Sequence, residues 1–155
     1  MPSQTNSVPG GANGFSCVYL TSSASAAALA SKLLESAQIR IHHSTGLEGA
    51  HERLKATQSR VLLTDVAFQA GHWRDALRMA ATLPGTALVV VSRLADERLW
   101  IGALERGAYD LILWPFRADE LRRVLENAHF YSSRADAPMR KAQSDSTPRY
   151  ARQRA

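Results

Sequence analysis

The sequence lacks several features that define whole classes of protein. Cys17 is its one cysteine, so an intramolecular disulfide is excluded and the chain fits a reducing compartment. No apolar run approaches the roughly 20 residues of a membrane-spanning helix, and the amino end does not have the basic, apolar and small-residue order of a signal peptide. We therefore expect a soluble cytoplasmic protein whose 155 residues form one domain.

Positive charge is in excess, but it is concentrated at one end. The net charge is +5, and residues 134–155 carry +4 of it, while residues 1–13 carry no charged side chain. We predict a disordered segment at 1–13, a folded domain at 14–133 and a disordered basic tail at 134–155. The tail is too short to fold a DNA-binding domain. Any association with nucleic acid would be electrostatic and unspecific, and would weaken with salt.

Five short segments that read as strands, most of them apolar, alternate with stretches whose apolar residues recur at helical spacing. The segments are residues 15–20, 39–43, 61–66, 86–92 and 111–114. Strands that alternate in this way with helices form a parallel sheet covered by helices on both faces. The sequence therefore predicts an α/β fold with a doubly wound, parallel five-stranded sheet.

The central segment, Val61 to Val66, contains a carboxylate, Asp65, where the buried strand ends. In open α/β sheets that position lies at the carboxyl edge, where ligands bind. Asp65 is therefore our first candidate functional residue. A cap on the following turn is the alternative interpretation.

Two stretches resemble the receiver domains of two-component response regulators. Residues 103–116, Ala-Leu-Glu-Arg-Gly-Ala-Tyr-Asp-Leu-Ile-Leu-Trp-Pro-Phe, are similar to the family's Ala-Leu-x-x-Gly-Ala-x-Asp segment followed by a strand and Lys-Pro-Phe. Residues 62–66, Leu-Leu-Thr-Asp-Val, resemble the strand that carries the phospho-accepting aspartate. The resemblance covers roughly residues 15 to 130. It implies a flavodoxin-like (βα)5 sandwich with strand order 2-1-3-4-5, a phospho-acceptor position at Asp65 and a cis bond between Trp114 and Pro115.

The family's other pocket residues are mostly replaced in this sequence. Its acidic pair aligns with Thr21 and Ser22, and its lysine aligns with Trp114. Hydroxyl groups bind Mg²⁺ far less well than carboxylates, and indole supplies no cation. We therefore expect no cofactor and no metal site, although weak Mg²⁺ binding through Asp65 stays open. The structural interpretation of Trp114 is a side chain that fills the space of the lysine and the ion.

The end of the fourth segment keeps one residue of the family pattern. Ser92 matches the hydroxyl residue that contacts the phosphate in the family, whereas Leu111 stands where the family usually has its switch aromatic. Arg93 follows Ser92 at the pocket edge. It is either an ordinary exposed arginine or a substitute for the missing lysine.

With these replacements, the sequence resembles the degenerate receivers, also called pseudo-receivers. We expect a stand-alone signalling module without enzymatic activity that binds a protein partner, such as a histidine kinase or a downstream regulator. The family commonly uses the face of the fourth helix, fifth strand and fifth helix, and a homodimer is possible. That face carries Arg98, Trp100, Arg106, Arg117 and Arg122. The alternative is an active receiver that a histidine kinase phosphorylates on Asp65.

A metal site built from His42, His43 and His51 is a weaker hypothesis. Adjacent strand residues point to opposite faces, so His42 and His43 are poorly placed to share an ion. We expect surface or core histidines. We also expect Cys17 to be a small buried hydrophobic residue in the first strand.

Overall fold

The computed structural model describes residues 14–133. The predictions for 1–13 and 134–155 fall outside the described residues, so the division of the chain into three parts stays a prediction. Among residues 14–133, no helix combines the length and the apolar character needed to cross a bilayer.

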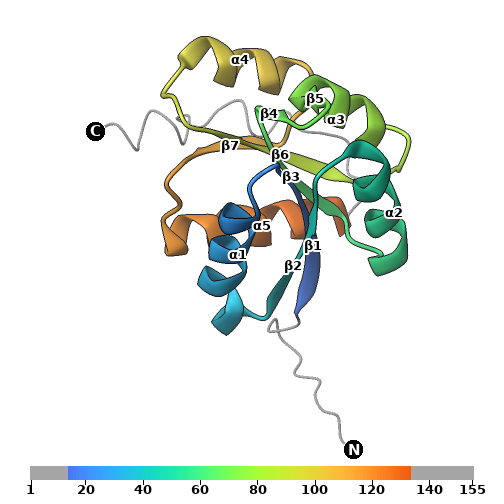
Figure 1. Ribbon diagram of the computed structural model, residues 1–155, viewed down its shortest axis with the longest axis vertical. Helices are drawn as coiled ribbons and strands as arrows, with labels where there is room; N and C mark the ends of the chain where they lie inside the picture. Colours follow the sequence, from blue (N-terminus) through green and yellow to red (C-terminus); the bar gives the residue numbers. More distant parts are fainter. Residues whose placement is uncertain (1–13, 134–155) are drawn as a thin grey trace, which may run out of the picture.

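The described chain alternates strands and helices from end to end (Figure 1). In chain order the elements are β1 (Phe15–Leu20), α1 (Ala24–Leu33), the 3-10 helix η1 (Glu35–Ala37), β2 (Ile39–Ser44), α2 (Leu47–Thr57), β3 (Val61–Asp65), β4 (Ala67–Phe68), β5 (Gly71–His72), α3 (Trp73–Ala80), β6 (Ala87–Ser92), α4 (Glu97–Glu105), β7 (Asp110–Leu113) and α5 (Ala118–Ser133).

Five of these strands form one parallel sheet in the order β2-β1-β3-β6-β7. When the five are numbered among themselves, this is the order 2-1-3-4-5. The prediction of a doubly wound, flavodoxin-like α/β fold is confirmed. The strand β3, which ends in Asp65, lies at the centre of the sheet.

The sheet separates two apolar layers, as the strand alternation requires. One layer joins Cys17, Tyr19 and Leu63 to the inner faces of α1 and α5. The other joins Val18 and Leu62 to α2, α3 and α4. Burial on both faces explains why the inner strands β3 and β6 are mostly apolar, whereas the edge strand β2 is less buried and more polar. It also fixes which residues of β1 and β3 share a face.

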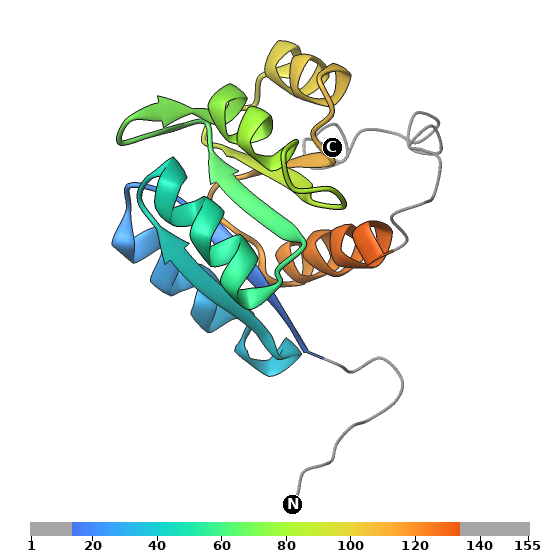
Figure 2. The ribbon, with the colours of Figure 1, turned by 90° about the vertical axis from the view of Figure 1, so that its right-hand side faces the viewer.

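A small antiparallel hairpin, β4 and β5, follows the central strand and was not predicted. It projects beyond the end of β3 (Figure 2). Each of its strands has two residues, which is too short for an alternating pattern to be recognised in a sequence.

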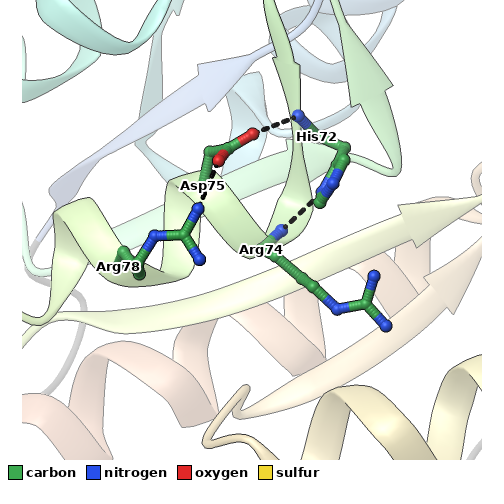
Figure 3. Close-up of polar contacts among 4 residues, drawn as sticks. All are labelled: His72, Arg74, Asp75 and Arg78. Atoms are coloured by element: carbon green, nitrogen blue, oxygen red, sulfur yellow. Dashed lines mark hydrogen bonds and ion pairs between the residues drawn. The ribbon is translucent and has the colours of Figure 1, made fainter.

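The hairpin leads directly into α3, whose first turn is held by polar contacts (Figure 3). The His72 ring accepts a hydrogen bond from the Arg74 N–H at 3.2 Å, and the Asp75 carboxylate accepts one from the His72 N–H at 3.0 Å. Asp75 also pairs with Arg78 at 2.6 Å. These contacts satisfy amide groups that a helix start otherwise leaves without partners, while the adjacent Trp73 is buried in the core.

The predicted cis peptide bond between Trp114 and Pro115 is confirmed. Gly107 follows α4 with φ +114°, the left-handed region that a residue with a side chain rarely adopts. The fifth strand ends one residue earlier than predicted, so Trp114 begins the turn after β7.

Candidate functional site

Asp65 lies half-buried at the carboxyl end of the central strand, and both of its carboxylate oxygens accept hydrogen bonds from β1 and the residue that follows it. The Tyr19 hydroxyl donates to Oδ1 at 2.6 Å, and the Thr21 hydroxyl donates to Oδ2 at 2.5 Å. Both donor residues are fully buried. The two bonds are short and charge-assisted, so they fix the carboxylate firmly against β1.

The register of the sheet explains this cluster. Tyr19 pairs with Leu63 and Leu20 pairs with Thr64, so Thr21 stands next to Asp65 in the neighbouring strand position. Alternate residues of a strand share a face, so Tyr19 lies on the same face of the sheet as Thr21, two residues earlier in the chain. The long tyrosine side chain spans that step, and its hydroxyl reaches the carboxylate.

Thr21 itself is held at several points. Its Oγ1 accepts a hydrogen bond from the Ser23 N–H at 3.0 Å while it donates to Asp65. Its backbone N–H donates to the Ser44 carbonyl, and its own carbonyl accepts from His43 Nε2 at 2.9 Å. The Thr21 hydroxyl is therefore a fixed donor toward Asp65.

The Tyr19 hydroxyl is equally committed to donating. Burial raises its pKa, and the hydrogen bond to Asp65 and the negative charge of Asp65 raise it further. The nearby Arg93 cation acts in the opposite direction, but more weakly. Tyr19 consequently keeps its proton throughout the physiological pH range.

Within residues 14–133, the other predicted pocket hydroxyls make no hydrogen bond with the Asp65 carboxylate. Ser22 is exposed. Ser92 is buried, but its hydroxyl donates to the Leu94 carbonyl at 2.9 Å and accepts from the Leu94 N–H at 3.1 Å. Ser92 therefore holds its own loop, and within residues 14–133 its hydroxyl makes no hydrogen bond with Asp65.

An aromatic group forms the rim beside the carboxylate. The Trp114 and Phe116 rings meet edge to face at 4.8 Å between centroids, and the Tyr19 and Phe116 rings meet edge to face at 6.1 Å between centroids. The exposed Arg93 guanidinium lies over the Trp114 ring, 4.6 Å from its centroid. Trp114 is partly buried, and Arg93 is both exposed and close enough to lower the pKa of Tyr19. Pro115 is exposed in the turn between the two rings.

These residues do not fit a bound Mg²⁺ ion. Both Asp65 oxygens already receive O–H donors, and the Thr21 oxygen already serves as donor and acceptor. Across residues 14–133, no cluster of three or more histidine, cysteine, aspartate or glutamate side chains is arranged to hold a metal. Mg²⁺ needs several hard oxygen ligands, and here one carboxylate is available.

The remaining candidates have ordinary structural environments. His42 is hydrogen-bonded to Ser16 at 3.1 Å, and His43 is hydrogen-bonded to the Thr21 carbonyl. His51, on α2, is half-buried. Cys17 is fully buried, as expected, and burial raises the pKa of its thiol to about 12. An open hollow of about 990 Å³, lined in part by Ser16, His42 and His129, lies at the amino edge of the sheet, opposite Asp65.

Tyr19 is the residue of this site that sequence reasoning missed. A signal for it was present, because Tyr19 and Thr21 are alternate positions of one strand and Leu63 and Asp65 are alternate positions of its neighbour. A tyrosine in an otherwise apolar buried strand needs a partner for its hydroxyl. Asp65, two residues after the Leu63 that pairs with Tyr19, is that acceptor.

Comparisons with known proteins agree on the fold. No protein-family model matches the sequence, and a search of curated proteins finds no similar protein. Among solved structures, similarity extends to a receiver domain protein from Clostridium thermocellum, with a TM-score of 0.68 and 17% identity over 77% of this chain and 97% of that chain. A CheY-like receiver domain protein from Methanospirillum hungatei gives a TM-score of 0.66 and 14% identity over 78% and 98%.

A longer protein, NtrX from Brucella abortus, gives a TM-score of 0.69 and 20% identity over 78% of this chain and 28% of that chain. The chain therefore has the fold of response-regulator receiver domains. At these identities the similarity establishes the fold, and the chemistry has to be argued from this chain's own residues.

Proposed function

We propose that this protein is a degenerate receiver of two-component signalling, which acts by binding protein partners and is not efficiently phosphorylated in a Mg²⁺-dependent reaction. The observation that carries the proposal is the environment of Asp65. Its carboxylate is held by the neutral Tyr19 and Thr21 hydroxyls, and Trp114 stands at the rim. In this proposal the chain is a cytoplasmic, non-enzymatic module.

The argument rests on the charge that phosphoryl transfer requires. A carboxylate that attacks an anionic phosphoryl donor must overcome repulsion, and a metal ion or a fixed cation normally offsets it. The present donors are neutral hydroxyls. Arg93 lies over Trp114 instead of pairing with Asp65, since the structure gives Asp65 no ion pair within residues 14–133.

The proposed partner surface is the face formed by α4, β7 and α5. Its arginines, Arg98, Arg106, Arg117 and Arg122, are exposed, and Ile101 is 41% exposed. Trp100 is half-buried on the same helix as Ile101. An exposed aliphatic group among arginines suits contact with a protein, whether a histidine kinase, a downstream regulator or a second copy of the chain.

An active receiver, phosphorylated on Asp65 by a histidine kinase, is the second candidate. It is favoured by the retained aspartate at the carboxyl edge and by the proximity of the Arg93 cation, which influences Tyr19.

Intact-mass measurement after incubation with acetyl phosphate, with and without Mg²⁺, separates the two candidates. Asp65→Asn is the control, because it removes the acceptor with little change in shape. We expect no added phosphoryl group on the wild-type chain under either condition. A Mg²⁺-dependent gain of one phosphoryl group that Asp65→Asn abolishes would establish the active receiver instead.

A further inference from the structure

Asp65 is a partly buried anion that is stabilised by two hydroxyl groups. Within residues 14–133 no basic side chain makes an ion pair with it, and two hydroxyl donors approach it from β1 and the position after it. Tyr19 reaches it from the core side, where the tyrosine is fully buried and its ring contacts Phe116. A buried anion without hydrogen bonds is costly, so these two donors are what allows the carboxylate to remain there.

We propose that Tyr19 is the positioning residue that keeps Asp65 unreactive, through the hydrogen bond of its hydroxyl to Oδ1. This inference rests on the proposed function, since it names the residue responsible for the silent aspartate. The Tyr19 hydroxyl withdraws electron density from Oδ1 and holds the carboxylate toward β1. Thr21 does the same for Oδ2.

The chemical step that is suppressed can be written out. With acetyl phosphate, an Asp65 oxygen forms a bond to phosphorus while the bond from phosphorus to the acetate oxygen breaks, and acetate leaves with the electron pair. The attacking oxygen must use a lone pair and turn toward the donor. Each oxygen accepts one O–H hydrogen bond. A lone pair remains for the attack, but the hydrogen bond makes that oxygen a poorer nucleophile and opposes its turn toward the phosphoryl donor.

Tyr19 differs from the residues that align with the family's charged groups in one respect that can be tested. Thr21, Ser22 and Trp114 occupy the positions of the missing acids and lysine, so substituting them restores the charged groups directly. Tyr19 lies two residues earlier on β1 and is unchanged by those substitutions, so we expect its hydroxyl to stay on Oδ1. Restoring the charged groups alone is therefore insufficient.

The experiment compares Thr21→Asp/Ser22→Asp/Trp114→Lys with the same variant that also carries Tyr19→Phe. The phenylalanine keeps the ring and its packing and removes one oxygen atom. The matched control adds Tyr131→Phe, the same atomic change at a half-buried tyrosine on α5. Mg²⁺ affinity is measured by titration calorimetry, and the rate of phosphorylation by acetyl phosphate is measured by intact mass.

We expect Tyr19→Phe to raise the phosphorylation rate of the restored variant by about tenfold, the effect of removing one charge-assisted hydrogen bond from the nucleophile. Tyr131→Phe should leave the rate unchanged. Equal rates with and without the Tyr19 hydroxyl would overturn the inference and leave the proposed function intact. Phosphorylation of the wild-type chain would instead refute the proposed function itself.

A second measurement covers the case in which the restored variants do not fold. In the otherwise wild-type chain, carboxyl groups are labelled with a water-soluble carbodiimide and glycine ethyl ester, and labelling of Asp65 is followed by peptide mass. Tyr19→Phe should increase the labelling rate of Asp65 several-fold, while Tyr131→Phe should not. An unchanged rate in Tyr19→Phe would contradict the role assigned to the hydroxyl.

Discussion

The hydrogen bond between Tyr19 and Asp65 should appear as a large coupling energy in a double-mutant cycle. The cycle consists of Tyr19→Phe, Asp65→Ala and the double variant, with the free energy of unfolding measured for each. The bond is short, its donor is fully buried and its acceptor is charged. Such bonds stabilise folded proteins more than neutral, exposed ones do.

The structure gives the expected size of each step. Tyr19→Phe removes the donor, but the half-buried Asp65 can replace it with water, so we expect a loss of about 1.5 kcal/mol. Asp65→Ala leaves the buried Tyr19 hydroxyl without its acceptor, whereas Thr21 keeps its bond from Ser23. We expect this variant to lose about 2–4 kcal/mol.

The double variant should be much less destabilised than the sum of the single variants, because neither group is left without its partner. The expected coupling energy is about 1.5–3 kcal/mol, obtained from urea denaturation curves of all four proteins. Tyr131→Phe with Asp65→Ala provides the control cycle and should be additive. Additivity to within about 0.5 kcal/mol in the Tyr19 cycle would refute the argument that these side chains form one unit.

Three further outcomes follow from other contacts. Asp96→Ala should lower the free energy of unfolding by about 1 kcal/mol in urea denaturation, because its side chain caps two amides at the start of α4, and Asp96→Asn should retain most of the stability. Burial, and to a lesser extent the Arg60 charge, lower the pKa of His129, whose ring stacks on Phe15 at 4.1 Å. The contribution of the neutral His129 ring to the free energy of unfolding is therefore present above pH 6.5 and is lost as the pH falls through the lowered pKa. Between pH 7.5 and 5.5, the urea midpoint should therefore drop less for His129→Phe than for wild type. The Cys17 thiol should react with Ellman's reagent only on unfolding, because it is buried and burial raises its pKa to about 12; fast labelling of the native protein would contradict this.

The sequence was sufficient to predict the sheet because burial on both faces leaves a strong pattern. Residues 61–63 and 87–91 are apolar at every position, and the stretches between the five sheet strands contain apolar residues at helical spacing. The β4–β5 hairpin was missed because two-residue strands carry no periodicity. Tertiary contacts made by the buried Phe68 and Trp73 anchor that segment, and such contacts cannot be read from local sequence.

The place of Asp65 in the fold could be predicted from the sequence, whereas its hydrogen-bond partners could not. Asp65 lies where the strand pattern placed it, and Trp114 lies at the rim. The partner of Asp65 was not predicted, since identifying Tyr19 requires the register between β1 and β3 as well as the reach of its side chain. Ser92 shows the reverse case, because it matches the family pattern in sequence but bonds to its own loop.

Charge balance connects the substitutions in the pocket to one another. By the resemblance, an ordinary receiver pocket sums three carboxylates, one lysine and a divalent cation to zero. Here the acidic pair is Thr21 and Ser22, so Asp65 is left as a single negative charge. A lysine and a divalent ion would overcompensate that charge, whereas two neutral hydroxyl donors stabilise it without adding charge. The Arg93 guanidinium lies over Trp114, and within residues 14–133 it makes no ion pair with Asp65. In the proposed degenerate receiver, the replacement of the acids and of the lysine would be one electrostatic change, in which the Tyr19 and Thr21 hydroxyls stabilise the remaining carboxylate.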